Sequence, residues 1–326
     1  MPPSETVMDV QGLNVEFGTA GGIVRAVTDV SFSIGRGEVL GLVGESGSGK
    51  STVAHALIRV LPRSARCTGA VTFGGANVLA MSSAQLRRYR WEGVSLVMQG
   101  AMNALNPVLT IEAQIVDAIR AHRRVSRRAA LASVGDLLEL VGIDPGRRRA
   151  YPHELSGGMR QRCVIAIALA LEPDLVIMDE PTTALDVVVQ RSIMDEIDRL
   201  RAQLGFSVLL ISHDLDLVAE RATHLAIMYA GRLAEIGPAA RVVASPLHPY
   251  TEALLSSTMT VDGDVGRLAE LPGKPPDLTG PDAGCAFFPR CARARPGHDE
   301  VVPALLESEP GHYVACHLYD DRVAAR

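Results

Sequence analysis

The feature that most constrains this chain is a glycine-rich loop at residues 44–51 (GESGSGKS), directly after an apolar run at residues 39–43 (VLGLV). A buried strand, a glycine-rich turn and a following helix form the strand–loop–helix unit typical of a parallel α/β core. In that unit the backbone N–H groups of the loop and the N-terminus of the helix surround phosphate groups. The sequence therefore predicts an α/β fold with a phosphate-binding loop, followed by a helix over about residues 50–61.

Lysine usage indicates that Lys50 is the cation of this loop. Lys50 and Lys274 are the only lysines among 32 lysine and arginine residues, so the other 30 are arginines. A compact ammonium fits between the β- and γ-phosphates of ATP, where a planar guanidinium is too bulky. The hydroxyl of Ser51 suits Mg²⁺, and Gly49 and Thr52 are placed to donate to α- and β-phosphate oxygens. The predicted ATP-binding residues of the loop are Gly44, Ser46, Gly47, Gly49, Lys50, Ser51 and Thr52.

Composition predicts a globular chain that remains in the cytosol. A hydrophobic content of 47%, a charged content of 21% and a net charge of −5 argue against disorder and against a nucleic-acid-binding surface. The apolar stretches are much shorter than the roughly 20 residues that a transmembrane helix needs, and the N-terminus lacks the pattern of a signal peptide. In the cytosol the five cysteines are expected to be reduced, buried or metal-bound rather than paired in disulfides.

Antiparallel strands open the predicted fold. Residues 7–34 alternate apolar and polar side chains, which suggests strands with one solvated face. Further buried strands are expected at residues 175–179 and 207–212, where short apolar runs occur. Helices are expected at residues 111–122, at residues 127–141 and from Ser156 onward.

The helical patterns between the buried strands predict a helical subdomain over about residues 100–171. Prolines and three of the five cysteines accumulate after about Gly237. This change in composition suggests a boundary near residue 240. The predicted organisation is a nucleotide-binding domain over residues 1–240 and a C-terminal extension over residues 241–326.

Titratable side chains follow two of the predicted buried strands. Asp179 and Glu180 end the first, where a carboxylate pair is costly unless it is solvated or bound to a cation. Asp179 suits Mg²⁺ through water, and Glu180 suits a base that orients or deprotonates the water attacking the γ-phosphate. His213 follows the second strand. Alone it would be a structural histidine, but beside strand ends that carry nucleotide chemistry it is a candidate catalytic residue.

In this order the motifs resemble the ATP-binding subunit of an ABC transporter, over about residues 7–237. The resemblance implies that residues 155–159 (LSGGM) are the signature loop, Gln99 is the Q-loop glutamine that reaches the catalytic Mg²⁺, His213 is the switch histidine and Phe17 stacks on adenine. It also implies that Ser156, Gly157 and Gly158, at the start of a helix, serve ATP held by a partner subunit. Two ATP molecules would then lie between two head-to-tail subunits.

Two positions depart from the family pattern, one in the signature loop and one after the Q-loop glutamine. Met159 stands where many members have glutamine, and Gly100-Ala101-Met102 replaces the Asp-Pro that often follows the Q-loop glutamine. The second change affects the region expected to couple the ATPase to a permease.

The C-terminal extension resembles that of dipeptide and oligopeptide importer ATPases. The resemblance rests on residues 245–251 (SPLHPYT), 271–276 (LPGKPP) and 284–291 (GCAFFPRC). In that family four cysteines commonly hold an iron–sulfur cluster. The matching positions here are Cys285, Cys291, His298 and Cys316.

These thiolates and the imidazole suit either a 4Fe-4S cluster or tetrahedral Zn²⁺. The simpler interpretation is three idle thiols and a surface histidine. Cys67 and Cys163 lie apart from this group and are expected to act as small apolar residues.

The resulting hypothesis is an ATP-hydrolysing subunit that powers import of di- or oligopeptides, with ATP and Mg²⁺ as cofactors. Its expected partners are a second, homologous ATPase subunit in a heterodimer, two transmembrane permease subunits and, indirectly, an extracytoplasmic solute-binding protein, but no nucleic acid. Its expected place is the cytoplasmic face of the cell membrane. The alternatives are the same machinery importing nickel or short glycans, or a soluble ABC-type ATPase that works without a permease.

Overall fold

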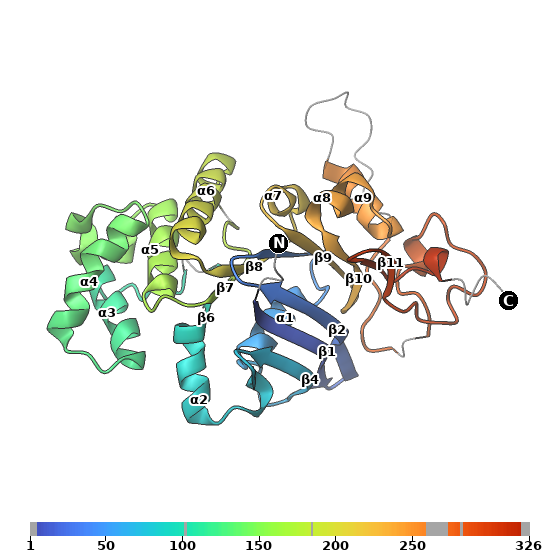
Figure 1. Cartoon of the computed structure of the whole chain (residues 1–326), viewed down its shortest axis with the longest axis horizontal. Helices are drawn as coiled ribbons and strands as arrows, with labels where there is room; N and C mark the ends of the chain where they lie inside the picture. The colour runs from blue at the N-terminus through green and yellow to red at the C-terminus, as the bar shows by residue number, and fades with distance from the viewer. Residues whose placement is uncertain (1–4, 101–102, 184, 259–272, 281–282, 321–326) are drawn as a thin grey trace. The chain divides into compact units, whose positions relative to one another are not determined.

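The computed structural model of this chain describes residues 5–100, 103–183, 185–258, 273–280 and 283–320. The chain divides into two compact units (Figure 1). The first unit comprises residues 1–7, 34–38 and 80–209, and the second comprises residues 8–33, 39–79 and 210–326. Each unit is described by itself below.

The second unit contains a sheet with the strand order β2-β1-β4-β5. Strands β1 and β4 pair antiparallel, with Val10 opposite Val71. Along β1, Met8, Val10, Leu13 and Val15 are fully buried, which gives the strand one core-facing side. The predicted antiparallel strands at the start of the chain are thereby confirmed. The bounds are β1 (Thr6–Thr19), β2 (Gly22–Gly35), β4 (Ala65–Phe73) and β5 (Ala76–Asn77).

The second unit also holds a run of strands in the order β3-β9-β10-β12-β11. β3 pairs in parallel with β9, and the remaining pairs of this run are antiparallel. All five residues of β3 are buried, as expected for a strand inside a parallel sheet. The bounds are β3 (Val39–Val43), β9 (His224–Tyr229), β10 (Arg232–Pro238), β11 (Leu306–Glu309) and β12 (His312–Val314).

Helix α1 (Lys50–Leu57) follows the glycine-rich loop, as predicted, but it ends four residues earlier than the sequence suggested. Arg59 adopts a left-handed backbone conformation with φ of 53°. That conformation cannot continue a right-handed helix. The predicted end near residue 61 was therefore wrong.

The C-terminal region packs within the second unit. Strand β12 pairs with β10, with Val314 opposite Glu235, and Leu247, Val314 and Cys316 form a buried apolar cluster. The helices of this unit after β8 are α7 (Leu215–Ala219), α8 (Ala239–Ala244) and α9 (Pro249–Thr258). The boundary near residue 240 stays a prediction about domain organisation.

In the first unit β6 and β7 pair in parallel, and helices α3, α4 and α5 contact one another, as Figure 1 shows. Thr110, Ser126, Ser156 and Asp186 cap the N-termini of four helices by accepting a backbone N–H three residues later. The bounds are α2 (Ser83–Arg88), β6 (Val94–Val97), α3 (Ile111–His122), α4 (Arg127–Leu140), α5 (Gly157–Leu169), β7 (Leu175–Asp179) and α6 (Val187–Leu204).

The buried strands β7 and β8 (Ser207–Ser212) have the bounds predicted from the sequence, and β8 runs from the first unit into the second. Helices α3 and α4 also match their predictions, with α4 one residue shorter. Within the described ranges, every helix is too short or too polar to cross a bilayer.

Candidate nucleotide-binding site

Glycine is required at two positions of the loop that joins β3 to α1. A Cβ atom on Gly44 would lie 2.1 Å from the backbone oxygen of Met228, and one on Gly49 would lie 2.3 Å from the backbone oxygen of Ala26. Gly49 also has a φ of 101°, which side chains rarely allow. The glycine spacing therefore reflects close backbone packing around the loop as well as access for phosphate.

Lys50 lies inside the loop, with only 6% of its surface exposed. Its Nζ donates to the backbone oxygens of Gly44 and Glu45, at 2.6 and 2.8 Å, and to Ser48 Oγ at 3.3 Å. The ammonium is thus enclosed by the loop into which the sequence placed it. Ser51 lies half-buried in the first turn of α1.

The remaining predicted loop residues flank this centre. Thr52 is half-buried in the same turn of α1, whereas Ser46 and Gly47 are exposed. Gly47 has a φ of 81°, so it too uses the freedom of glycine. The exposed face of the loop leaves its turn accessible to a ligand.

Residues from the C-terminal region hold the loop at Glu45. The backbone N–H of Glu45 donates to the hydroxyl of Tyr250 at 2.9 Å. Its carboxylate receives two hydrogen bonds of 2.8 Å from the guanidinium of Arg290. Arg290 also donates to the hydroxyl of Tyr229 at 3.2 Å. This support was not predictable, because nothing local in the sequence relates Glu45 to residues about 200 or more positions away.

Two predicted catalytic residues of the first unit meet after β7. Gln99 Nε2 donates to a carboxylate oxygen of Glu180 at 3.1 Å. Thr183 Oγ1 donates to the same oxygen at 2.8 Å. Glu180 has a φ of 48°, an uncommon backbone conformation that is often found at functional sites. Asp179, the last residue of β7, is 2% exposed.

The start of α5 presents the predicted signature loop. Ser156 caps the helix by accepting the N–H of Met159 at 3.3 Å, and its side chain is exposed. Gly157 and Gly158 form the first turn, and a Cβ on Gly158 would lie 2.9 Å from Val189 Cγ1. An exposed helix start with little side-chain bulk suits an anion, because its N–H groups and dipole are positive.

The other predicted residues are distributed as follows. His213 follows β8 in the second unit and is exposed. Phe17 lies half-buried on β1, opposite Ala65. The glycine-rich loop belongs to the second unit, whereas Gln99, Ser156, Asp179 and Glu180 belong to the first. The nucleotide roles of all these residues stay predictions. Ala101 and Met102, which follow the Q-loop glutamine, lie outside the described residues.

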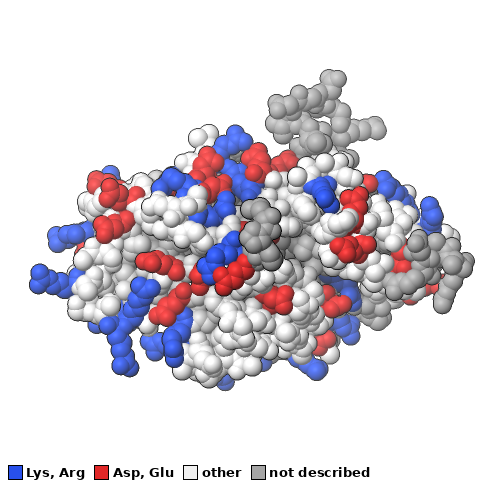
Figure 2. Space-filling model, viewed as in Figure 1, with Lys and Arg blue, Asp and Glu red and all other residues white. Residues whose placement is uncertain are grey.

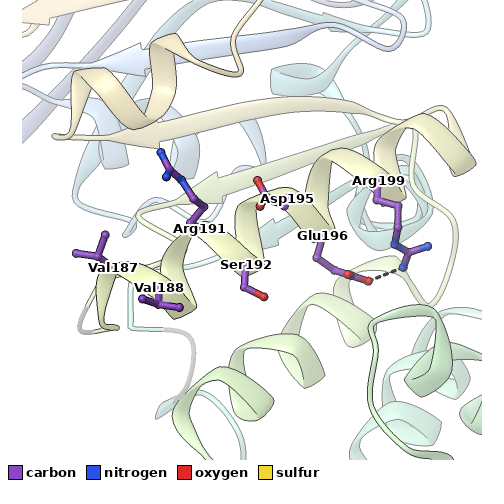
Figure 3. Close-up of a pocket in the computed structure, with 7 residues that line it drawn as sticks. All are labelled: Val187, Val188, Arg191, Ser192, Asp195, Glu196 and Arg199. Atoms are coloured by element: carbon purple, nitrogen blue, oxygen red, sulfur yellow. Dashed lines mark hydrogen bonds and ion pairs between the residues drawn. The ribbon is translucent and has the colours of Figure 1, made fainter.

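A groove of about 530 Å³ lies along α6 in the first unit (Figure 3). At its end Val187 and Val188 are 79% and 80% exposed, directly after the helix cap Asp186. Farther along the groove Glu196 forms an ion pair with Arg199, drawn as a dashed line. The groove thus combines an apolar start with a charged wall.

The four predicted metal ligands line one pocket of the second unit. Cys285, Cys291, His298 and Cys316 surround it together with His317. In the described part of the chain, however, no three His, Cys, Asp or Glu side chains are arranged so that they could hold a metal ion. The structure therefore groups these residues without supporting the predicted metal site.

Burial makes two thiols of the pocket, those of Cys285 and Cys316, weaker acids. It raises the pKa of Cys285, and it raises the pKa of Cys316 to about 11. Burial also raises the pKa of Cys163, outside the pocket, to about 12. Because Cys163 is buried in the core, it acts as the small apolar residue that was predicted.

The sequence matches two families. Residues 27–183 match the family described as ABC transporter. Residues 234–297 match the oligopeptide/dipeptide transporter C-terminal region.

Similar proteins match over most of the chain. The dipeptide transport ATP-binding protein DppD of Bacillus subtilis is 44% identical over 322 residues, which is 98% of this chain and 96% of that protein. A probable peptide ABC transporter ATP-binding protein of Sinorhizobium fredii is 44% identical over 97% of this chain and 96% of that protein. The oligopeptide transport ATP-binding protein OppD of Mycobacterium tuberculosis is 45% identical over 95% of this chain, but over 51% of its own length.

Two solved structures have a similar fold. A dimeric ATP-binding cassette in a post-hydrolysis state, bound to ADP and Pi, has a TM-score of 0.63 and 24% identity, over 71% of this chain and 98% of that chain. A component of an ABC transporter complex of Clostridium perfringens has a TM-score of 0.62 and 25% identity, over 74% of this chain and 92% of that chain.

The fold that carries this glycine-rich loop is therefore that of an ABC-type ATPase, which confirms the predicted fold class. The chain is also related in sequence to this class of protein, since its identity to the Bacillus protein extends through the C-terminal region. The chain belongs to the family of ATP-binding subunits of oligopeptide and dipeptide ABC transporters.

Proposed function

We propose that this chain hydrolyses ATP to power the import of di- or oligopeptides through a membrane ABC importer. The observation that carries the proposal is the 44% identity to a dipeptide transport ATP-binding protein over 98% of the chain. That identity includes the C-terminal region typical of oligopeptide and dipeptide transporters. Both the ATPase and the substrate class of the transporter follow from this one relationship.

In the proposed mechanism the phosphates of ATP bind in the loop between β3 and α1. Lys50 would leave the loop oxygens that it now contacts and bind the β- and γ-phosphates. Phe17 would stack on the adenine. The enclosed ammonium supports this role, because an anionic ligand is the partner that best replaces three neutral oxygens.

Mg²⁺ would be held by Ser51, Gln99 and Asp179, whose hydroxyl, amide and carboxylate oxygens are donors that Mg²⁺ accepts. When bound, the ion supplies charge neutralisation to the transferring phosphoryl group. Glu180 orients the water that attacks the γ-phosphate, so that ADP and inorganic phosphate result, and His213 acts as the switch histidine. The hydrogen bonds from Gln99 and Thr183 support this role, because they fix the orientation of the Glu180 carboxylate.

The proposed assembly contains a second, homologous ATPase subunit and two permease subunits at the cytoplasmic face of the membrane. The exposed helix start at Ser156 and the exposed pair Val187 and Val188 support a partner subunit on the first unit. On the face drawn in Figure 2, basic and acidic side chains of the described residues are intermixed, which does not favour a nucleic-acid partner. Co-purification with the membrane fraction tests the permease partners.

Glu180→Gln tests the catalytic role. A glutamine side chain keeps an oxygen that can accept from Gln99 and Thr183 but removes the base, so ATP hydrolysis by the assembled complex should fall by about 10²- to 10⁴-fold. ATP binding should remain. The matched control is Glu139→Gln, on an exposed position of α4. Normal hydrolysis by the Glu180→Gln complex would refute the role given to Glu180.

We also propose that Cys285, Cys291, His298 and Cys316 bind either an iron–sulfur cluster or Zn²⁺. The proposal comes from the family resemblance of these four positions, which line one pocket although the described side chains are not arranged as metal ligands. Since burial raises the pKa of Cys285 and of Cys316, binding would release protons from these thiols and would weaken as the pH falls. Anaerobically purified complex should then contain iron and sulfide with broad visible absorbance, or zinc without colour. The absence of both metals would exclude the site.

A further inference from the structure

Arg290, in the C-terminal extension, contacts the loop that is proposed to bind the phosphates of ATP. We propose that Arg290 is a positioning residue, which sets the affinity for ATP by holding Glu45 and neutralising its charge. This inference rests on the proposed role of the loop in ATP binding. It adds a function for the C-terminal extension within the ATPase itself.

The pair between Arg290 and Glu45 is well shielded from water. The side chain of Arg290 is 4% exposed and that of Glu45 is 24% exposed. Two parallel N–H···O bonds of 2.8 Å join them, which is the strong bidentate geometry of arginine and carboxylate. The hydrogen bond to Glu45 is the main reason that the pKa of Arg290 is raised, so the guanidinium stays protonated.

Aromatic side chains fix the position of the guanidinium. The central carbon of the Arg290 guanidinium lies 5.7 Å from the ring centre of Tyr229 and 6.0 Å from that of Phe287. Tyr229 also accepts a hydrogen bond from Arg290 through its hydroxyl. Arg290 is therefore oriented before it meets Glu45, and little side-chain freedom remains to be lost.

Glu45 transmits this constraint to Lys50. The backbone oxygen of Glu45 accepts a hydrogen bond from Lys50 Nζ at 2.8 Å, and its backbone N–H donates to Tyr250. The same residue is thus held through its side chain by Arg290 and through its backbone by Tyr250. A shift of Glu45 would displace the loop segment on which the position of Lys50 depends.

Arg290 should also raise the affinity for ATP through its positive charge. An unpaired carboxylate on Glu45 would repel a triphosphate bound in the same loop, and the repulsion would be larger near the protein than in bulk water. Arg290 cancels this charge. Loss of Arg290 should therefore weaken ATP binding, and removing the charge of Glu45 in the same chain should restore part of the lost affinity.

The test measures ATP binding by calorimetry on the full-length chain and ATP hydrolysis by the assembled complex. For Arg290→Ala the Kd and the KM for ATP should rise about tenfold, with kcat changed by less than about twofold. In the double variant Glu45→Gln, Arg290→Ala, the Kd for ATP should return to within about threefold of that of the parent chain. For Arg290→Lys the Kd for ATP should lie between those of the parent chain and Arg290→Ala, since lysine keeps the charge but loses the bidentate geometry.

Arg293→Ala is the matched control. Arg293 lies in the same segment and pairs with Glu252 of α9, where its Nη2 donates to both carboxylate oxygens. These two bonds do not involve the loop. Its removal should leave the KM for ATP unchanged. Thermal unfolding of each variant shows whether the chain remains folded, and Arg290→Lys and Glu45→Gln carry the comparison if Arg290→Ala does not fold.

The inference is overturned if Arg290→Ala behaves like Arg293→Ala, or if Glu45→Gln fails to restore affinity in the double variant. Lys50→Ala separates this result from the proposed function. If Lys50→Ala abolishes ATP binding while Arg290→Ala does not alter it, the nucleotide site stands and the role of Arg290 is wrong. If Lys50→Ala binds ATP normally, the proposed nucleotide site itself is wrong.

Discussion

Acidification should destabilise the second unit through His248, a histidine that is 3% exposed. Burial lowers its pKa from 6.5 to about 4. Its Nδ1 accepts the N–H of Tyr250 at 2.9 Å, and a hydrogen bond with the backbone of Ala315 partly opposes the shift. A protonated imidazole could not accept the bond from Tyr250, since both its nitrogens carry hydrogens. The folded chain therefore favours the neutral form.

The sign of the effect follows from proton binding. Below about pH 6.5 the unfolded chain takes up a proton at His248 that the folded chain resists, so the stabilising contribution is lost as the pH falls toward about 4. Between about pH 7.5 and about pH 5 this one group should lower the free energy of unfolding by about 2 kcal/mol. The contribution should be complete above about pH 7.5.

Chemical denaturation at both pH values measures this difference. The chain has nine histidines, so the comparison is between the parent chain and His248→Asn, whose side-chain oxygen can still accept the N–H of Tyr250. The variant should show a pH-dependent loss smaller by about 2 kcal/mol. His153→Asn, at an exposed position, is the control. An equal pH dependence in the parent and His248→Asn chains would refute the assignment.

Two glycine substitutions should differ in their effect on stability. Gly49→Ala would place a Cβ 2.3 Å from a backbone oxygen at a φ of 101°, so thermal or chemical unfolding should show a loss of about 3 kcal/mol or more. Gly158→Ala would meet the side chain of Val189 at 2.9 Å, which can move, so the loss should be about 1 kcal/mol. Equal losses of stability for the two variants would contradict the idea that the close contact of Gly49 with a backbone oxygen is what makes its substitution costly.

Local patterns were sufficient to predict the elements that have a clear apolar run or a helix cap, whereas the strands β9 to β12 were not predicted. The buried strands β3, β7 and β8 had the predicted bounds, because short apolar runs end where polar or glycine residues begin. Helices α3, α4 and α5 begin after the capping residues Thr110, Ser126 and Ser156. The helix after the phosphate loop was predicted too long, since nothing in the apolar pattern indicates the left-handed conformation of Arg59.

The site was predictable only where its residues lie within motifs. Lys50 and Glu180 were predicted from their local sequence and Gln99 from the family resemblance, and their roles stay predictions. The structure joins Gln99 and Glu180 by a hydrogen bond. Arg290 was missed because its partner Glu45 is 245 residues away along the chain. Such a pair has no periodicity or spacing by which a single sequence could reveal it.

Glu235 of β10 explains why the C-terminal extension is better studied by point substitutions than by deletion. Its fully buried carboxylate accepts the backbone N–H groups of Leu247 and His248 and is paired with His312 Nε2 at 2.7 Å. All three partners lie after residue 240. A chain truncated there would leave a buried carboxylate without these donors, which costs several kcal/mol. Loss of ATPase activity after truncation would thus report a damaged sheet, whereas Arg290→Ala leaves this network in place.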